Sequence, residues 1–201
     1  MHGKKAKKER RFLMLLIELG KSLKEVFRKE ENMNFEKLQN QFLLLDTSFV
    51  ISFGRYKKFY APLIDEIFKS DVQVLINDVV RFELTAFARN ENEKKDVQDL
   101  IEHLSQGKVE DSLLNFDRSN FDRAASLAQA YTKNGTPFKE GMMGDLLIGA
   151  DLLKYKDSSV NVFLATENNK DFPTKVFERV GVEAIDCGNE INVVGFYHLG
   201  D

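Results

Sequence analysis

Short runs of consecutive apolar residues recur from Phe42 onward, separated by stretches with helical periodicity. Phe42–Leu45 has four apolar residues in succession without polar alternation, which is typical of a strand buried on both faces of a parallel sheet. Further strands are predicted at 72–76, 161–165, 182–186 and 191–197, with a brief extended piece at Leu113–Leu114. Because helices alternate with these strands, the pattern predicts an α/β fold with a central, mainly parallel sheet and helices on both faces, a three-layer α/β/α arrangement.

The intervening segments carry apolar residues at helical spacing, with turn residues or capping residues near their ends. Helices are predicted for residues 47–53, 60–69, 78–87, 91–106, 120–133, 145–155 and 175–180. Pro62 falls near the first turn of its helix, where proline is tolerated, and Asn134-Gly135 is a helix stop.

A different pattern precedes this domain. Between Arg11 and Lys29, five apolar residues recur every three or four positions, which predicts an amphipathic helix: Phe12, Leu16, Leu19, Leu23 and Phe27. The helix can dock on its own domain, or it can pair with a partner or a second copy; the sequence leaves both open. Glu30–Gln41 is read as a polar connector, so the predicted division is a basic arm and helix (1–41) followed by one domain (42–201).

Charge is unevenly distributed. The net charge of −3 combines +6 in residues 1–30 with −9 in the remaining 171 residues, which indicates an arm that faces a polyanion, the acidic body or a second copy. A single cysteine, Cys187, excludes an internal disulfide framework and a Cys-rich zinc site. No apolar stretch reaches membrane-spanning length, and no signal peptide is expected. The expected setting is cytoplasmic, without a membrane.

Four acids occupy comparable places in this layout. Asp46 follows the first strand, Glu83 lies in the helix after the second, Asp145 begins a helix, and Asp171 lies in the loop after the strand at 161–165. Singly, each is explained as a helix cap, a turn residue or an exposed helix residue. Gathered together they would repel one another unless a cation lay among them, and all-oxygen ligands suit Mg²⁺ or Mn²⁺, one ion or two. Such ions activate water for hydrolysis of phosphodiesters.

From about Phe42 to Tyr197 the sequence resembles the PIN-domain ribonucleases, above all the toxin type of bacterial toxin–antitoxin pairs. Four segments carry the resemblance: 44–48 (LLDTS), 80–84 (VRFEL), 144–150 (GDLLIGA) and 166–172 (TENNKDF). The last matches a T-x-N-x-x-D-F pattern. The chain departs from the family in having about forty residues before the first strand, an enlarged loop at 137–143 and a longer stretch from Asp145 to Asp171.

The resemblance implies a PIN-like fold, an RNA substrate and a metal-dependent nuclease activity. It assigns metal binding and catalysis to Asp46, Glu83, Asp145 and Asp171. Supporting roles, in orienting carboxylates, ordering the loop or touching a phosphate, fall to Thr47, Ser48, Thr166 and Asn168. It further implies an antitoxin-like protein partner, and we expect a homo-oligomer, a dimer.

Two other functions compete with this reading. One is a PIN-like module that binds RNA or protein without cutting; four mutually repelling acids speak against it. The other is a haloacid-dehalogenase-like phosphatase, which requires a second aspartate where this chain has Ser48. No phosphate-binding loop of the G-x-x-x-x-G-K-[ST] type is present, and the three histidines lie outside every motif. Arg55, Lys57 and Lys58 either contact RNA or form a solvated helix face.

Overall fold

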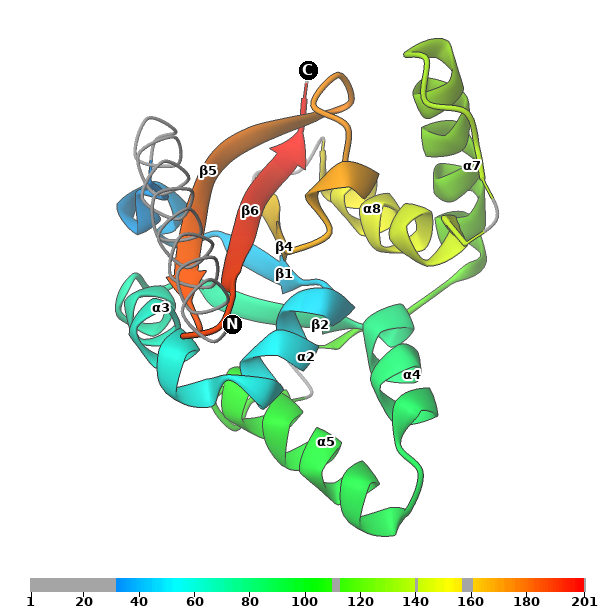
Figure 1. The fold of residues 1–201 in the computed structure, drawn as a ribbon. Helices are drawn as coiled ribbons and strands as arrows, with labels where there is room; N and C mark the ends of the chain where they lie inside the picture. The colour runs from blue at the N-terminus through cyan, green and yellow to red at the C-terminus, as the bar shows by residue number, and fades with distance from the viewer. Residues whose placement is uncertain (1–31, 110–112, 140, 157–160, 201) are drawn as a thin grey trace, which may run out of the picture. The chain divides into compact units, whose positions relative to one another are not determined.

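A computed structural model describes residues 32–109, 113–139, 141–156 and 161–200 (Figure 1). The chain divides into two units, Met1–Asn32 and Met33–Asp201, and the second contains the sheet and the helices. The amphipathic helix predicted between Arg11 and Lys29 lies outside the described residues. Among the residues that are described, no helix is both long enough and apolar enough to span a bilayer.

A six-stranded sheet forms the centre of the domain, in the order β3-β2-β1-β4-β6-β5. Its strands are β1 (Phe42–Leu45), β2 (Gln73–Asn77), β3 (Leu113–Leu114), β4 (Val162–Thr166), β5 (Phe177–Asp186) and β6 (Ile191–Leu199). The first four run parallel, whereas β6 is antiparallel to both β4 and β5. The predicted mainly parallel sheet is therefore confirmed.

Six α-helices of the described part surround this sheet: α2 (Thr47–Arg55), α3 (Lys57–Lys69), α4 (Asp78–Phe87), α5 (Glu91–Leu104), α7 (Arg118–Lys133) and α8 (Met143–Tyr155). Each matches a predicted helix to within a few residues. Short 3₁₀ helices cover Phe35–Leu38 and Asn169–Asp171. In Figure 1, α2 and α3 lie on one side of the sheet and α7 and α8 on the other, which confirms the predicted α/β architecture.

The chain order explains this division. From β1 the sheet grows outward through β2 to β3, and the chain then returns to place β4 on the other side of β1. Because crossovers between parallel strands are right-handed, reversing the direction of travel moves the connecting helices to the opposite face. The reversal lies between β1 and β4, and in open α/β sheets the carboxyl ends of such a strand pair border the ligand crevice.

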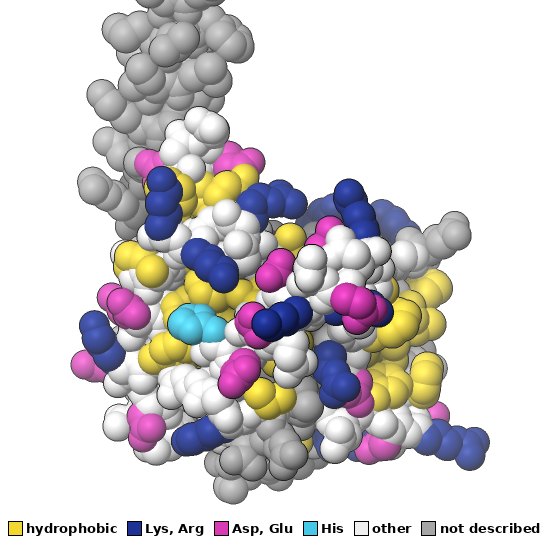
Figure 2. Space-filling model, turned by 90° about the horizontal axis from the view of Figure 1, so that it is seen from below, with side chains coloured by type: hydrophobic (Ala, Val, Ile, Leu, Met, Phe, Trp, Pro, Cys, Tyr) yellow, Lys and Arg dark blue, Asp and Glu magenta, His cyan; other side chains and the backbone are white. Residues whose placement is uncertain are grey.

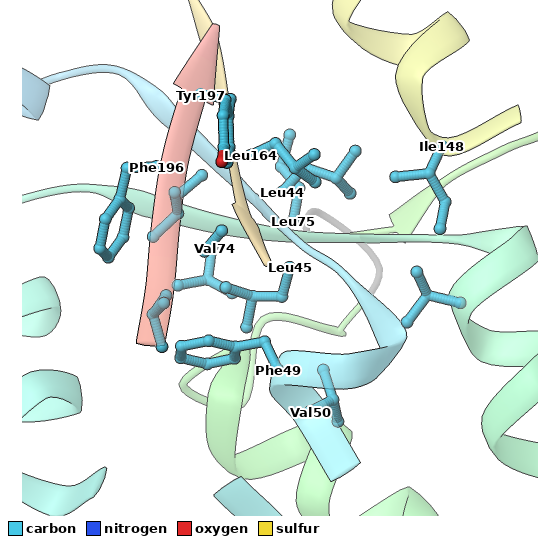
Figure 3. Close-up of a cluster of buried hydrophobic side chains, with 14 of the residues drawn as sticks. Leu44, Leu45, Phe49, Val50, Val74, Leu75, Ile148, Leu164, Phe196 and Tyr197 are labelled. Carbon is cyan, nitrogen blue, oxygen red and sulfur yellow. The ribbon is translucent and has the colours of Figure 1, made fainter. Parts of the chain in front are cut away.

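The core consists mainly of apolar side chains. Leu43, Leu44 and Leu45 of β1 are fully buried, as expected for a strand covered on both faces. Figure 3 shows how β1, β2, β4 and β6 direct Leu44, Leu75, Leu164 and Tyr197 into one cluster, with Phe49 of α2 beneath them. This packing fixes the ends of β1 and β4, from which the polar residues described below extend.

Two predicted segments differ from the structure. The helix predicted at 175–180 is wrong, because residues from Phe177 onward begin β5 and obtain their backbone hydrogen bonds from β6. A bulge between Arg179 and Gly181 interrupts the strand, and a Cβ at Gly181 would lie 2.9 Å from the Met33 Cα, so only glycine permits this approach. The segment read as a polar connector also contributes to the core, where its Phe35 and Leu38 are buried.

Candidate functional site

Asp46 lies at the carboxyl end of β1 and is 3% exposed. It occupies the N-cap position of α2, yet its side chain makes no capping hydrogen bond. Instead its Oδ2 accepts hydrogen bonds from Ser48 Oγ at 2.5 Å and from Thr166 Oγ1 at 2.7 Å. The explanation of Asp46 as a helix cap is therefore wrong; two hydroxyl groups hold its carboxylate in place.

The loop after β4 is joined to the start of α2 by the same hydroxyl groups. Ser48 Oγ accepts from the Glu167 amide at 3.1 Å, and Thr166 Oγ1 accepts from the Asn168 amide at 2.9 Å. The two hydroxyl oxygens are 3.3 Å apart. Ser48 and Thr166, both predicted as supporting residues, thus couple Asp46 to the segment that carries Asn168 and Asp171.

Glu83 reaches this region from α4. Thr47 donates a short hydrogen bond from its Oγ1 to Glu83 Oε2. The other carboxylate oxygen, Oε1, lies 2.7 Å from where a Cβ would stand on Gly144, the residue before Asp145. Glu83 is therefore held between the first residue of α2 and the first turn of α8, and the missing side chain of Gly144 makes room for it.

Asp145 shows that the four acids share one neighbourhood. The pKa of its carboxyl group is raised to about 7, chiefly by burial and then by the negative charges of Asp171, Asp46 and Glu83, in that order of size. A side-chain hydrogen bond with Asn168 opposes the shift. Since such charge effects fade within a few ångströms to about 10 Å, the fold brings all four predicted acids within electrostatic reach of one another.

Asp171 is fixed through its backbone. Its carbonyl oxygen accepts a hydrogen bond from the Tyr131 hydroxyl at 2.8 Å, which anchors the 3₁₀ turn to α7. Burial raises the pKa of Tyr131, and the charges of Asp145 and Asp171 add to the effect. Tyr131 therefore stays a neutral hydrogen-bond donor, and it leaves the Asp171 carboxylate free to act elsewhere.

The side chains do not form a closed coordination set. Within the described ranges, no three His, Cys, Asp or Glu side chains are disposed so that they could hold a metal ion as they stand. Each carboxylate is oriented by its own hydroxyl or amide partner. Repulsion between the negative charges keeps the carboxylates apart when no cation lies among them.

One acid of this region was missed by sequence reasoning. Glu167, half-buried, accepts hydrogen bonds from Ser52 Oγ at 2.8 Å and from the Tyr60 hydroxyl, which in turn accepts from Asn192 Nδ2 at 2.9 Å. Burial raises the pKa of Glu167, with a contribution from the charge of Asp46. The two hydroxyl groups that donate to Glu167 belong to residues 115 and 107 positions away in the sequence. No local sequence pattern therefore indicates that Glu167 belongs to this region.

A buried polar network behind the site was also missed. Asp151 of α8 is 1% exposed and accepts hydrogen bonds from Asn77 Nδ2 and Asn120 Nδ2, both at 2.8 Å. Asn77 also caps α4 by accepting from the Val80 amide at 2.9 Å, and Asn120 belongs to the capping box of α7. The network joins the helices that carry Glu83 and Asp145, and it fixes their relative position.

Exchanging donors and acceptors in this network tests the assigned hydrogen-bond directions. Both asparagine oxygens are already used, Asn77 Oδ1 by Val80 and Asn120 Oδ1 by Asp117, so both offer only N–H groups to Asp151. Asp151→Asn leaves one buried donor facing another and should cost about 1–3 kcal/mol of unfolding free energy. Asn120→Asp alone should cost more, because two buried carboxylates then face each other.

The double variant, Asp151→Asn with Asn120→Asp, restores a complete donor–acceptor chain, because the new amide at position 151 can accept from Asn77 and donate to the new carboxylate at position 120. Urea unfolding should show it more stable than either single variant. Additive losses in the double variant would contradict the assigned hydrogen-bond directions.

Comparisons with known proteins found no relative by sequence but did find solved structures with partial structural similarity. No family model matches the chain, and no curated protein matches its sequence. Among solved structures, VapBC-1 from nontypeable Haemophilus influenzae is 19% identical, with a TM-score of 0.49, over 66% of this chain and 90% of that chain. VapBC2 from Rickettsia felis, bound to a promoter DNA fragment, is 17% identical, with a TM-score of 0.46, over 66% and 91%. FitAcB from Neisseria gonorrhoeae is 21% identical, with a TM-score of 0.42, over 60% and 84%.

Proposed function

We propose that this chain is a metal-dependent endoribonuclease of the PIN type, which hydrolyses phosphodiester bonds in RNA. The observation that carries the proposal is the raised pKa of Asp145, to which Asp171, Asp46 and Glu83 all contribute. Four acids from four separate segments of the chain lie within electrostatic reach of one another near the carboxyl ends of β1 and β4. Their concentration of negative charge costs stability, and a divalent cation is the partner that would offset it.

The donor set fits Mg²⁺ or Mn²⁺. All four side chains supply hard carboxylate oxygens, and no histidine or cysteine belongs to any of the four motif segments. Asp46, Glu83, Asp145 and Asp171 would hold the ion, directly or through water. When bound, such an ion lowers the pKa of a ligated water and offsets the charge that develops on a phosphodiester.

The chain's own residues prepare the site for this role. Ser48 and Thr166 donate to Asp46 and fix one of its oxygens, while Thr47 fixes one oxygen of Glu83. In each case the second carboxylate oxygen remains available. Asn168 does the same for Asp145, and Tyr131 holds the turn that carries Asp171. These contacts orient the carboxylates before any ion binds, which lowers the cost of ordering them around it.

A binding module that does not cut is the second candidate. A scaffold gains nothing from assembling four repelling carboxylates, whose cost must be offset elsewhere in the fold. Three hydroxyl groups and one amide that orient these acids are likewise unnecessary for a scaffold. The nuclease therefore accounts for more of the observed contacts.

Cleavage of a fluorescently labelled RNA tests the proposal. We expect cleavage with Mn²⁺ or Mg²⁺, none in EDTA, and a loss of at least about a hundredfold in rate for Asp46→Asn. Asp46→Asn retains the volume of the side chain, so circular dichroism should show an unchanged fold. Cleavage that persists undiminished in EDTA or in Asp46→Asn would contradict the mechanism, and Mn²⁺ binding without cleavage of any RNA would favour the scaffold.

A further inference from the structure

Large apolar side chains are exposed beside the carboxylates. Phe82 and Phe87 of α4 are 71% and 68% exposed, and Met143, at the start of α8, is 49% exposed. Figure 2 shows hydrophobic side chains gathered at the right-hand edge of the face in view, the side on which α4 lies in Figure 1. Phenylalanine is usually buried in folded proteins. Two exposed phenylalanines on a single ten-residue helix therefore indicate a surface that binds another molecule.

These three residues, here called the aromatic rim, belong to the two helices that carry Glu83 and Asp145. Phe82 precedes Glu83, and Phe87 follows it by four residues, which places Phe87 one turn farther along the same face of α4. Met143 precedes Gly144, against which the Glu83 carboxylate lies. The aromatic rim and two of the four acids, Glu83 and Asp145, therefore share α4 and the first turn of α8.

Two arginines flank the aromatic rim. Arg81 precedes Phe82, and Arg89 follows Phe87 by two residues; both are exposed. Within the described ranges neither guanidinium group makes an ion pair, whereas Lys94 pairs with Glu91 and Lys154 with Asp117. By contrast, Arg55 and Lys58, the cations considered from the sequence, lie over the rings of Tyr56 and Phe59.

We propose that the aromatic rim is a stacking platform for unpaired bases of single-stranded RNA, with Arg81 and Arg89 contacting the phosphates on either side. Exposed aromatic faces interleaved with arginines are the combination that binds single strands, because bases stack on the rings while the backbone follows the cations. A duplex keeps its bases stacked on one another and gains nothing from the rings. This inference rests on the proposed nuclease function, and it assigns to Phe82 and Phe87 the binding of unpaired bases.

Conservative substitutions separate stacking from simple apolar contact. Phe→Leu keeps apolar area but removes the aromatic face, whereas Phe→Tyr keeps the face. Fluorescence anisotropy of a labelled single-stranded RNA of about 12 nucleotides, in EDTA so that it stays intact, should show Phe82→Leu and Phe87→Leu binding about tenfold more weakly each, corresponding to the loss of one stacked base. Phe82→Tyr and Phe87→Tyr should bind as the wild type does. Phe59→Leu, on α3, is the matched control and should have no effect.

Three results would overturn the inference. Equal affinity for the single strand and for its duplex would exclude recognition of unpaired bases. Unchanged affinity in both leucine variants would exclude stacking. If Phe82→Ala with Phe87→Ala instead converts a dimer to a monomer in sedimentation analysis while RNA affinity is retained, the aromatic rim is an interface between copies of the chain.

The binding assay is independent of the proposed function. Single-strand binding that depends on Phe82 and Phe87, without cleavage in Mn²⁺, would refute the nuclease and leave the aromatic rim as an RNA-binding surface. Metal-dependent cleavage whose KM is unchanged in Phe82→Leu and Phe87→Leu would refute the aromatic rim and leave the nuclease.

Discussion

Asp145→Asn should reduce the rate of RNA cleavage at least about a hundredfold, and at neutral pH it should make the metal-free protein more stable. The two effects have one cause. Burial and the charges of the other three acids disfavour the ionised form of Asp145 and raise its pKa to about 7. Removing that charge takes away a carboxylate needed to hold a cation, and it also removes the repulsion that the folded chain must bear.

The stability effect has a defined dependence on pH. The folded state binds a proton at Asp145 up to about pH 7, whereas the unfolded chain releases it near pH 3.8. Wild-type stability in EDTA therefore falls as the pH rises from about 4 to about 7, and it levels off above that range. Because solvent screens a half-buried group, we expect a loss of about 2 kcal/mol, roughly half of what the full shift implies.

Thermal unfolding in EDTA at pH 5 and pH 8 measures this difference. Asp145→Asn should lack the Asp145 part of the decline, so its advantage over the wild type should be larger at pH 8 than at pH 5. Asp99→Asn, an exposed residue of α5, is the control and should change neither cleavage nor the pH profile. Equal stability of Asp145→Asn and the wild type at pH 8, together with undiminished cleavage, would contradict the shared acidic site.

Gly144→Ala should lower RNA cleavage tenfold or more while the protein remains folded. The added Cβ would stand 2.7 Å from Glu83 Oε1, closer than such atoms approach, so the Glu83 side chain must move. The end of a flexible side chain moves at little cost. Alanine also favours the helical backbone of α8 relative to glycine, by up to about 1 kcal/mol. Stability should therefore be unchanged or slightly higher, although activity is lost.

A second helical glycine supplies the control. At Gly54 of α2 an added Cβ would meet the end of the Leu100 side chain at 3.2 Å, away from every acid of the site. Gly54→Ala should leave cleavage within about twofold of the wild type. Cleavage of wild-type rate by Gly144→Ala would show that the position of Glu83 against α8 does not matter for the reaction.

The arrangement of the site follows from sequence features that act locally. Consecutive apolar residues mark β1 and β4, and parallel strands end at one edge of a sheet, so residues just after them, such as Asp46 and Thr166, meet there. The helices that carry Glu83 and Asp145 are equally visible from their periodicity. Sequence reasoning therefore identified which acids come together, although it could not supply their hydrogen-bond partners.

What the sequence did not reveal depends on contacts between distant segments. Residues 177–180 form a strand because β6 pairs with them, and no local preference records that pairing. Asp151 has the sequence context of an ordinary helix residue, and only the approach of Asn77 and Asn120 makes it a buried network. The need for glycine at position 144 likewise becomes visible only in the folded structure, where the Glu83 carboxylate lies against it.

Crystals grown or soaked with MnCl₂ and measured at the manganese absorption edge test the central claim most directly. We predict an anomalous difference peak enclosed by the carboxylates of Asp46, Glu83, Asp145 and Asp171, with the first two still held by their hydroxyl donors. A saturating Mn²⁺ concentration that yields no peak there, or only a peak that none of these four side chains approaches, would contradict the account.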